Sequence, residues 1–122
     1  MHVGLQITLG ILLYLIGGLG LVSWGIFGRI VFTWNCTWLV NSATHKWGYQ
    51  TYKNTEDNSR NNWWVALLTF GEGWHNNHHH NQSSAQTGEK WWEIDLTYAM
   101  IKILHFAGLI KRYRNANKIV IQ

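Results

Sequence analysis

The sequence predicts an all-α integral membrane protein, made of a two-helix transmembrane hairpin and a helical region on the cytoplasmic side. Between Val3 and Phe32 only four strongly polar side chains occur, which is typical of membrane-embedded helices. Nine of the ten lysines and arginines lie from Lys46 to Lys118, and this asymmetry favours the cytoplasm for that part. The nine tryptophans suit the headgroup layer, where the indole ring and its N–H are both satisfied.

The apolar N-terminal stretch is predicted to cross the membrane twice. A single crossing needs about 20 apolar residues, whereas residues 3–38 are too many for one crossing and slightly few for two with a loop. Clustered glycines at positions 17, 18 and 20 weaken a helix and permit a tight turn. We therefore expect one helix over residues 3–18 and a second over residues 21–46. Arg29 would then lie near mid-membrane, facing a partner outside this sequence.

The rest of the chain, residues 47–122, is expected to form the cytoplasmic part. Residues 46–62 read as a polar loop, and residues 62–79 as a helical or strand-like core run. Apolar residues recur at helical spacing from Trp92 to Phe106, which with the basic tail suits a helix along the membrane surface. No groove-reading motif accompanies that tail, so we expect no nucleic-acid partner.

The stretch FGEGWHNNHHH holds four of the seven histidines. Spacings of three and four residues would place His75, His78 and His79 on one helical face, aimed at one cavity. The two adjacent rings diverge by about 100°, which suits ligands of two metal ions better than three ligands of one. Neutral imidazole favours iron, zinc, copper or nickel. Glu72 could accept the other ring N–H of His75 and fix its tautomer. The alternative is a surface histidine patch.

A second candidate lies in the motif NSATH. Asn41 and His45 are four residues apart, so a continuing helix would place them on one face. Read alone, a histidine at the end of a helix more often interacts only with the last carbonyl groups and the helix dipole.

Three motifs together carry a resemblance: NSATHKWGY, SRNNWWVALLTFGEGWHNNHH and WWEIDLT. They resemble the C-terminal part of a membrane fatty acid desaturase of the Δ9 (stearoyl) type, in its bacterial and cyanobacterial form. The resemblance covers essentially the whole chain, 1–122, as part of one domain. It implies a non-haem di-iron centre held by histidines from three boxes. In this sequence His75, His78 and His79 match the final box, His45 matches an additional ligand, and Asn41 matches a residue that reaches iron through water.

The resemblance also implies that Trp38 and Thr37 line the acyl channel. Asp95 and Glu93, in WWEIDLT, could hydrogen-bond the metal-ligating histidines. Acidic residues at that place could equally stabilise the N-terminus of an interfacial helix.

The reaction implied by the resemblance is the O2-dependent introduction of a cis double bond, at Δ9, into a fatty acyl chain carried by lipid or CoA. The electron donor implied for this oxidoreductase is ferredoxin. Neither of the two earlier histidine boxes occurs before His75, so four histidine ligands are present, about half of what the family needs. We therefore expect that the isolated 122 residues neither hold a stable di-iron site nor desaturate lipid.

Two alternatives remain open beside an active enzyme. One is a half-enzyme that assembles with a separately encoded N-terminal half. The other is a catalytically silent, truncated membrane or metal-binding protein. A related hydroxylase or ketolase shares the histidine chemistry but fits the pair of motifs less closely.

Overall fold

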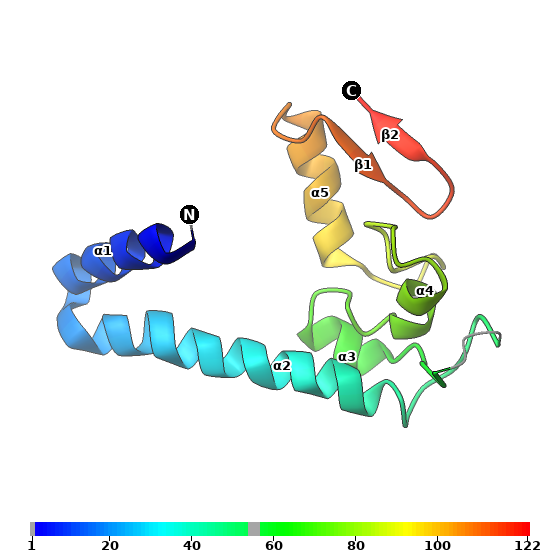
Figure 1. Cartoon of the computed structure of the whole chain (residues 1–122), viewed down its shortest axis with the longest axis horizontal. Coiled ribbons are helices and arrows are strands. Elements are labelled where there is room, and N and C mark those ends of the chain that lie inside the picture. Colours follow the sequence, from blue (N-terminus) through cyan, green and yellow to red (C-terminus); the bar gives the residue numbers. More distant parts are fainter. Residues whose placement is uncertain (1, 54–56) are drawn as a thin grey trace. The chain divides into compact units, whose positions relative to one another are not determined.

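The computed structural model describes residues 2–53 and 57–122 (Figure 1). The chain divides into two compact units, residues 1–37 and residues 38–122, and each is described by itself. The elements in chain order are α1 (His2–Val22), the π-helix η1 (Ser23–Gly28), α2 (Arg29–Ala43), α3 (Trp63–Leu68), α4 (His75–His80), α5 (Leu96–Phe106), β1 (Arg112–Arg114) and β2 (Ile119–Ile121).

The described chain is mostly helical, as the sequence predicts, with one addition. The strands β1 and β2 form an antiparallel pair in which Tyr113 lies opposite Val120. The all-α prediction did not include this small sheet, because three-residue strands leave too short an alternation of polar and apolar residues to be recognised.

The N-terminal unit is interrupted at the predicted glycines. Gly17 and Gly18 leave the helical conformation inside α1, and Gly18 has φ +65° and ψ −159°. This region of backbone conformation is open essentially to glycine alone, because any other side chain would clash there. The helical path therefore ends and restarts at the place where the sequence favours a turn.

Side chains on the two sides of this break approach one another. Arg29 Nη2 donates to Gln6 Oε1 at 2.6 Å, and Arg29 Nε donates to the Gly25 carbonyl at 3.2 Å. Leu13 packs so closely on Gly25 that a Cβ there would lie 2.6 Å from Leu13 Cδ1. Gln6 thus provides the partner for Arg29 that we expected from outside the sequence.

One helical stretch, Val3–Ala43, is long and apolar enough, judged by length and composition, to cross a membrane. At about 1.5 Å per residue, the part before the break (residues 2–16) rises about 22 Å and the part after it (residues 19–43) about 37 Å. A hydrocarbon core is about 30 Å thick. The second part is therefore long enough alone, and the two-crossing hairpin stays a prediction.

The C-terminal unit has a small apolar core and a larger polar one. Val40, Ala43 and Val65 are buried against Leu39 and Trp64. The buried polar side chains among the described residues are more numerous: Thr44, Ser59, Asn61, Asn62, His75, Asn76, Asn77, Thr87 and Glu93. Among the described residues, no buried side-chain nitrogen or oxygen lacks a hydrogen-bond partner, so this core avoids the cost of unpaired groups.

An asparagine network ties α4 to the polar loop before α3. The Asn61 side chain donates to Asn77 Oδ1 at 2.7 Å and accepts from the backbone N–H groups of Asn76 and Asn77. Asn76 in turn accepts from the backbone N–H groups of Thr51 and Tyr52. These bonds satisfy orphan donors at the start of α4 and hold the first histidine in place.

Residues 62–79 form two short helices with a turn, rather than one continuous run. Asn62 caps α3 by accepting from the Val65 N–H. The turn presses Gly73 against α3, since a Cβ at Gly73 would lie 2.0 Å from the Ala66 nitrogen. Only glycine allows this approach, and the turn sets where α4 begins.

The remaining boundaries differ from the predicted ones at two points. The second apolar helix ends at Ala43, so His45 lies in the following turn rather than on the helix. The C-terminal helix α5 begins only at Leu96, so Trp92 lies outside the helical spacing to which we assigned it.

Candidate metal centre

Three imidazole rings converge in the C-terminal unit. His45 comes from the turn after α2, and His75 and His79 come from α4. One ring nitrogen from each lies within 4.8 Å of those of the other two. The closest pair is His75 Nε2 and His79 Nε2, at 2.9 Å. The convergence brings together two segments that are 30 residues apart in the sequence.

His78 lies beside this group without belonging to it. Its ring centroid is 5.9 Å from that of His75 and 5.7 Å from that of His79. The three-membered cluster therefore uses His45 in place of His78. A role for His78 toward a second metal ion stays a prediction.

Asp57 lies behind two of the three rings. Its carboxylate Oδ2 contacts His79 Nδ1, and its backbone carbonyl lies 2.8 Å from His45 Nδ1. Its other carboxylate oxygen accepts from the Ser59 N–H at 3.0 Å. Sequence reasoning missed Asp57, whose only signal is an acidic residue in the polar loop between the two histidine segments.

The surroundings keep the imidazoles of His75 and His79 neutral. Burial, followed by the neighbouring rings of His79, His45 and His78, lowers the pKa of His75 to about 4. Burial also lowers the pKa of His79, although Asp57 acts in the opposite direction. The pKa of Asp57 itself lies below its ordinary value: burial raises it, but hydrogen bonds from Ser59 and the two nearby imidazoles outweigh that effect. Neutral rings are the form that binds metal.

The donor set fits a divalent transition metal. Two imidazole nitrogens bound at about 2.1 Å and at right angles would be about 3.0 Å apart, close to the 2.9 Å between His75 and His79. Imidazole suits zinc, copper, iron or nickel. A carboxylate on the far nitrogen of a ligating histidine is the usual orienting partner at such sites.

The other residues predicted at the site lie as follows. Asn41 is exposed on α2, and because that helix ends before His45 the two do not share one helical face. Trp38 is 63 % exposed on the same helix. Thr37, in the N-terminal unit, donates to the carbonyl of Thr33. These positions leave the predicted roles of Asn41, Trp38 and Thr37 as predictions.

The carboxylates named from the sequence make other contacts. Glu72 is exposed, and among the described residues no hydrogen bond or ion pair joins its carboxylate to a histidine. Asp95 caps α5 by accepting from the Tyr98 N–H at 2.8 Å, and its other oxygen accepts from the Thr87 N–H at 2.8 Å. Of the two interpretations given for Asp95, stabilisation of a helix N-terminus is the one observed.

Glu93 is buried and is linked to the histidine helix α4 through the side chain of Asn77. One of its oxygens accepts from Asn77 Nδ2 at 2.8 Å, and the other accepts from the Tyr49 hydroxyl. Burial and the Glu93 carboxylate raise the pKa of Tyr49, which keeps that phenol protonated as the donor. Glu93 therefore supports α4 through Asn77 rather than by contacting an imidazole.

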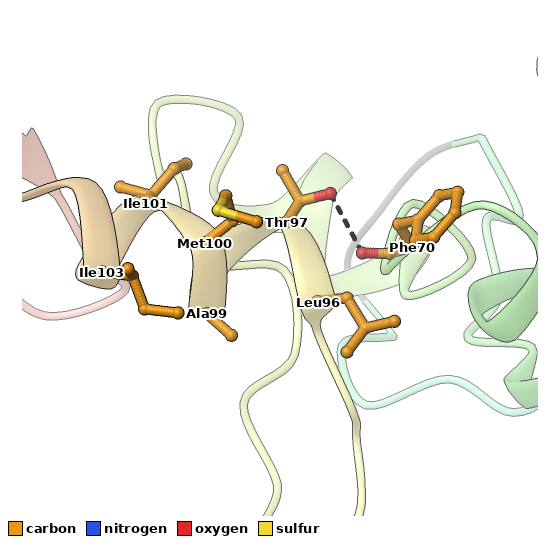
Figure 2. Close-up of a pocket in the computed structure, with 7 residues that line it drawn as sticks. All are labelled: Phe70, Leu96, Thr97, Ala99, Met100, Ile101 and Ile103. Atoms are coloured by element: carbon orange, nitrogen blue, oxygen red, sulfur yellow. Dashed lines mark hydrogen bonds between the residues drawn. The ribbon is translucent and has the colours of Figure 1, made fainter.

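Apolar hollows lie on the same unit. The larger one, of about 620 Å³, is lined by residues of α5 and by one residue of the turn after α3: Leu96, Thr97, Ala99, Met100, Ile101, Ile103 and Phe70 (Figure 2). Its two parts are joined by a hydrogen bond from Thr97 Oγ1 to the Phe70 carbonyl, at 3.0 Å. A smaller hollow, of about 100 Å³, is lined by Trp63, Leu67, Trp74, Trp92 and Ile94. Exposed apolar surface of this extent marks a lipid, ligand or partner contact.

A histidine cluster that could hold a metal ion, backed by a carboxylate, on a helical chain with an apolar segment long enough for a membrane, is typical of membrane-associated metalloproteins. Residues 2–106 match the family described as fatty acid desaturase. The chain therefore belongs to the fatty acid desaturase family, whose members are membrane-associated oxidoreductases.

Similar proteins of this family carry lipid-desaturase names. The chain is 58 % identical over 107 residues to an sn-1 stearoyl-lipid 9-desaturase of Synechocystis sp., covering 88 % of this chain and 33 % of that protein. It is 55 % identical over 114 residues to the sn-1 stearoyl-lipid 9-desaturase of Anabaena variabilis, covering 93 % and 42 %. It is 50 % identical over 108 residues to the sn-2 palmitoyl-lipid 9-desaturase of a Nostoc strain, covering 88 % and 38 %. The chain thus spans about a third to two fifths of their length.

Proposed function

We propose that this chain supplies part of the metal centre and of the acyl-binding surface of a membrane desaturase, which introduces a cis double bond at Δ9 into a lipid-bound fatty acyl chain. The observation that carries the proposal is the convergence of His45, His75 and His79, with Asp57 behind two of them. The names of the three similar proteins given above, all lipid 9-desaturases, favour an acyl-lipid over an acyl-CoA substrate.

In this proposal His45, His75 and His79 would hold one iron ion and His78 would be a ligand of a second. Asn41 would act on the second ion through water, as the family resemblance implies. When bound, the two iron ions would supply the oxidising chemistry: O2 is reduced to two water molecules by two electrons and two protons from a CH2–CH2 unit, two electrons from a donor such as ferredoxin and two protons from solvent.

The chain's own residues prepare the site for that chemistry. His75 is only 6 % exposed, so its imidazole stays neutral and is shielded from bulk water. The backbone carbonyl and the carboxylate of Asp57 each accept a ring N–H, which holds a proton at Nδ1 of His45 and His79. The opposite nitrogens are then left as bases that bind metal.

Membrane attachment is proposed to use both units. The arms on either side of Gly17 and Gly18 would enter the bilayer as a hairpin, and the concentration of lysine and arginine after His45 favours the cytoplasmic side for the histidines. The exposed apolar residues of α5 suit a helix lying at the membrane surface. Trp38 and Thr37 are proposed to line the acyl channel, as the family resemblance implies.

The test is complementation of a desaturase-deficient cyanobacterium. The chain is expressed alone, and also fused in place of the corresponding segment of the Synechocystis relative, and 9-unsaturated fatty acids are measured by gas chromatography. We expect unsaturation to return with the fusion, and to be lost in its His75→Ala and His79→Ala variants. The chain alone is expected not to restore it, because its sequence carries one histidine box of the three implied.

A fusion that accumulates in the membrane to the level of the intact relative and forms no unsaturated product would refute the proposal. So would an unchanged product yield in the His75→Ala fusion, because the buried imidazole would then have no part in the reaction. Restored unsaturation by the chain alone would overturn the expectation that the missing boxes are required.

A further inference from the structure

We propose that Asp57 is a positioning residue that sets two metal ligands at once, holding His45 and His79 in the tautomer whose Nε2 carries no proton and can bind metal. This inference rests on the proposed function only in taking the three histidines as metal ligands. It concerns how the ligands are oriented before any metal arrives, so it can be tested apart from desaturation.

All three oxygen atoms of Asp57 take part in these contacts. Oδ2 contacts His79 Nδ1, the backbone carbonyl lies 2.8 Å from His45 Nδ1, and Oδ1 accepts from the Ser59 N–H. Ionised carboxylate and carbonyl oxygens can only accept hydrogen bonds. Each ring must therefore carry its proton on Nδ1, and each is left with Nε2 as its base.

The loop that carries Asp57 is anchored to the helix that carries the ligands. Asn58 has φ +56°, a left-handed conformation that asparagine tolerates better than most residues, and this turns the chain between Asp57 and Ser59. Ser59 is fully buried, and its carbonyl accepts from Asn76 Nδ2 at 3.0 Å. Asn76 directly follows His75 on α4, so the acid and the ligands are held by one rigid network.

One residue thus couples ligands from two segments. His45 follows α2 and His79 lies on α4, and Asp57 links them through its main chain and its side chain. Loss of the side chain would release only the His79 ring, because the carbonyl bond to His45 would remain. Orienting partners of this kind typically change metal affinity about 10- to 100-fold when removed.

The test uses the 122-residue chain in detergent micelles, with Co²⁺ as the probe. Ring ¹⁵N NMR of the metal-free protein at pH 7.5 reports the tautomer of each histidine, and visible absorption reports Co²⁺ binding. We expect Nδ1–H tautomers for His45 and His79. Asp57→Asn should leave His45 unchanged, give His79 a mixture of tautomers, and weaken Co²⁺ binding about 10- to 100-fold.

Glu72→Gln is the matched control, because it removes the same charge from an exposed carboxylate three residues before His75. We expect it to change Co²⁺ affinity by less than about twofold, as for a surface charge outside the ligand contacts. An equal loss in both variants would overturn the proposal, since net charge would then explain the effect. Co²⁺ affinity unchanged in Asp57→Asn would also overturn it.

The ring ¹⁵N spectrum of the wild-type chain tests the proposed tautomers even if Asp57→Asn fails to fold. An Nε2–H tautomer at His79 in the wild-type chain would overturn the proposal without any variant. One Co²⁺ ion needs only these three rings and not the second ion of a di-iron centre, so the absence of Co²⁺ binding by the wild-type chain would overturn the assignment of the three rings as a metal site. If Asp57→Asn behaves as expected while the fusion enzyme makes no unsaturated fatty acid, only the proposed function fails.

Discussion

Acidification should destabilise the metal-free protein through His75. Burial and the neighbouring rings lower its pKa from 6.5 to about 4 in the folded chain. The folded state therefore binds fewer protons at His75 than the unfolded state between these values, and stability falls as the pH is lowered through that range. At about 1.4 kcal/mol per pKa unit, the full effect is about 3 kcal/mol, and about 2 kcal/mol of it is lost between pH 7.5 and 5.0.

The assay is urea unfolding in detergent with a chelator present, followed by tryptophan fluorescence. We expect the wild-type free energy of unfolding to fall by at least about 2 kcal/mol from pH 7.5 to 5.0. The lowered pKa of His79 acts in the same direction, whereas the lowered pKa of Asp57 acts only below its ordinary value of 3.8. His75→Gln cannot titrate and should lose markedly less. An equal pH dependence in this variant would refute the reasoning.

Three further predictions concern the scaffold. Gly73→Ala should lower the free energy of unfolding by more than about 3 kcal/mol or prevent folding, because its Cβ would lie 2.0 Å from the Ala66 backbone nitrogen. Gly4→Ala is the control, because a Cβ there would meet nothing within 4 Å, and the two variants are compared by thermal unfolding followed by circular dichroism. Asp95→Ala should lower the free energy of unfolding by about 1–3 kcal/mol, because it removes the cap of α5. Amide hydrogen exchange at Tyr98 should become faster, while exchange of the α4 amides should not change. Asn77→Ala should lower the free energy of unfolding by about 2–3 kcal/mol, measured by urea unfolding, because the Thr87 carbonyl and the Asn61 amide lose their Asn77 partner and buried Glu93 loses one of its donors. A loss under about 0.5 kcal/mol would contradict this.

The carboxylates show where spacing along the sequence no longer predicts which residues contact the histidines. Glu72 precedes His75 by three residues, so a helix through both would bring them together. The helix begins only at His75, and Glu72 is left exposed in the turn before it. The acid that does contact the ligands, Asp57, lies 22 residues before His79, in a loop without periodicity. No spacing rule connects such positions, because the path of a loop depends on its tertiary hydrogen bonds.

Residue order alone determined the features that depend on local chemistry. These are the apolar N-terminal stretch, its break at Gly17 and Gly18, the histidine motif of α4 and membership of a metal-binding family. Each follows from hydrophobicity, backbone freedom or ligand type within a few neighbouring residues.

Tertiary structure alone decided which side chains meet. It brought His45, which the sequence suggested as a ligand only through the family resemblance, into the cluster and left His78 beside it. It also assigned Asp95 to a helix cap. It also built the core of the described chain largely from buried polar side chains, four of them asparagines, whose amides are stable there because they find partners from distant segments. Such partners are set by how the loops close on one another, and no residue carries that information by itself.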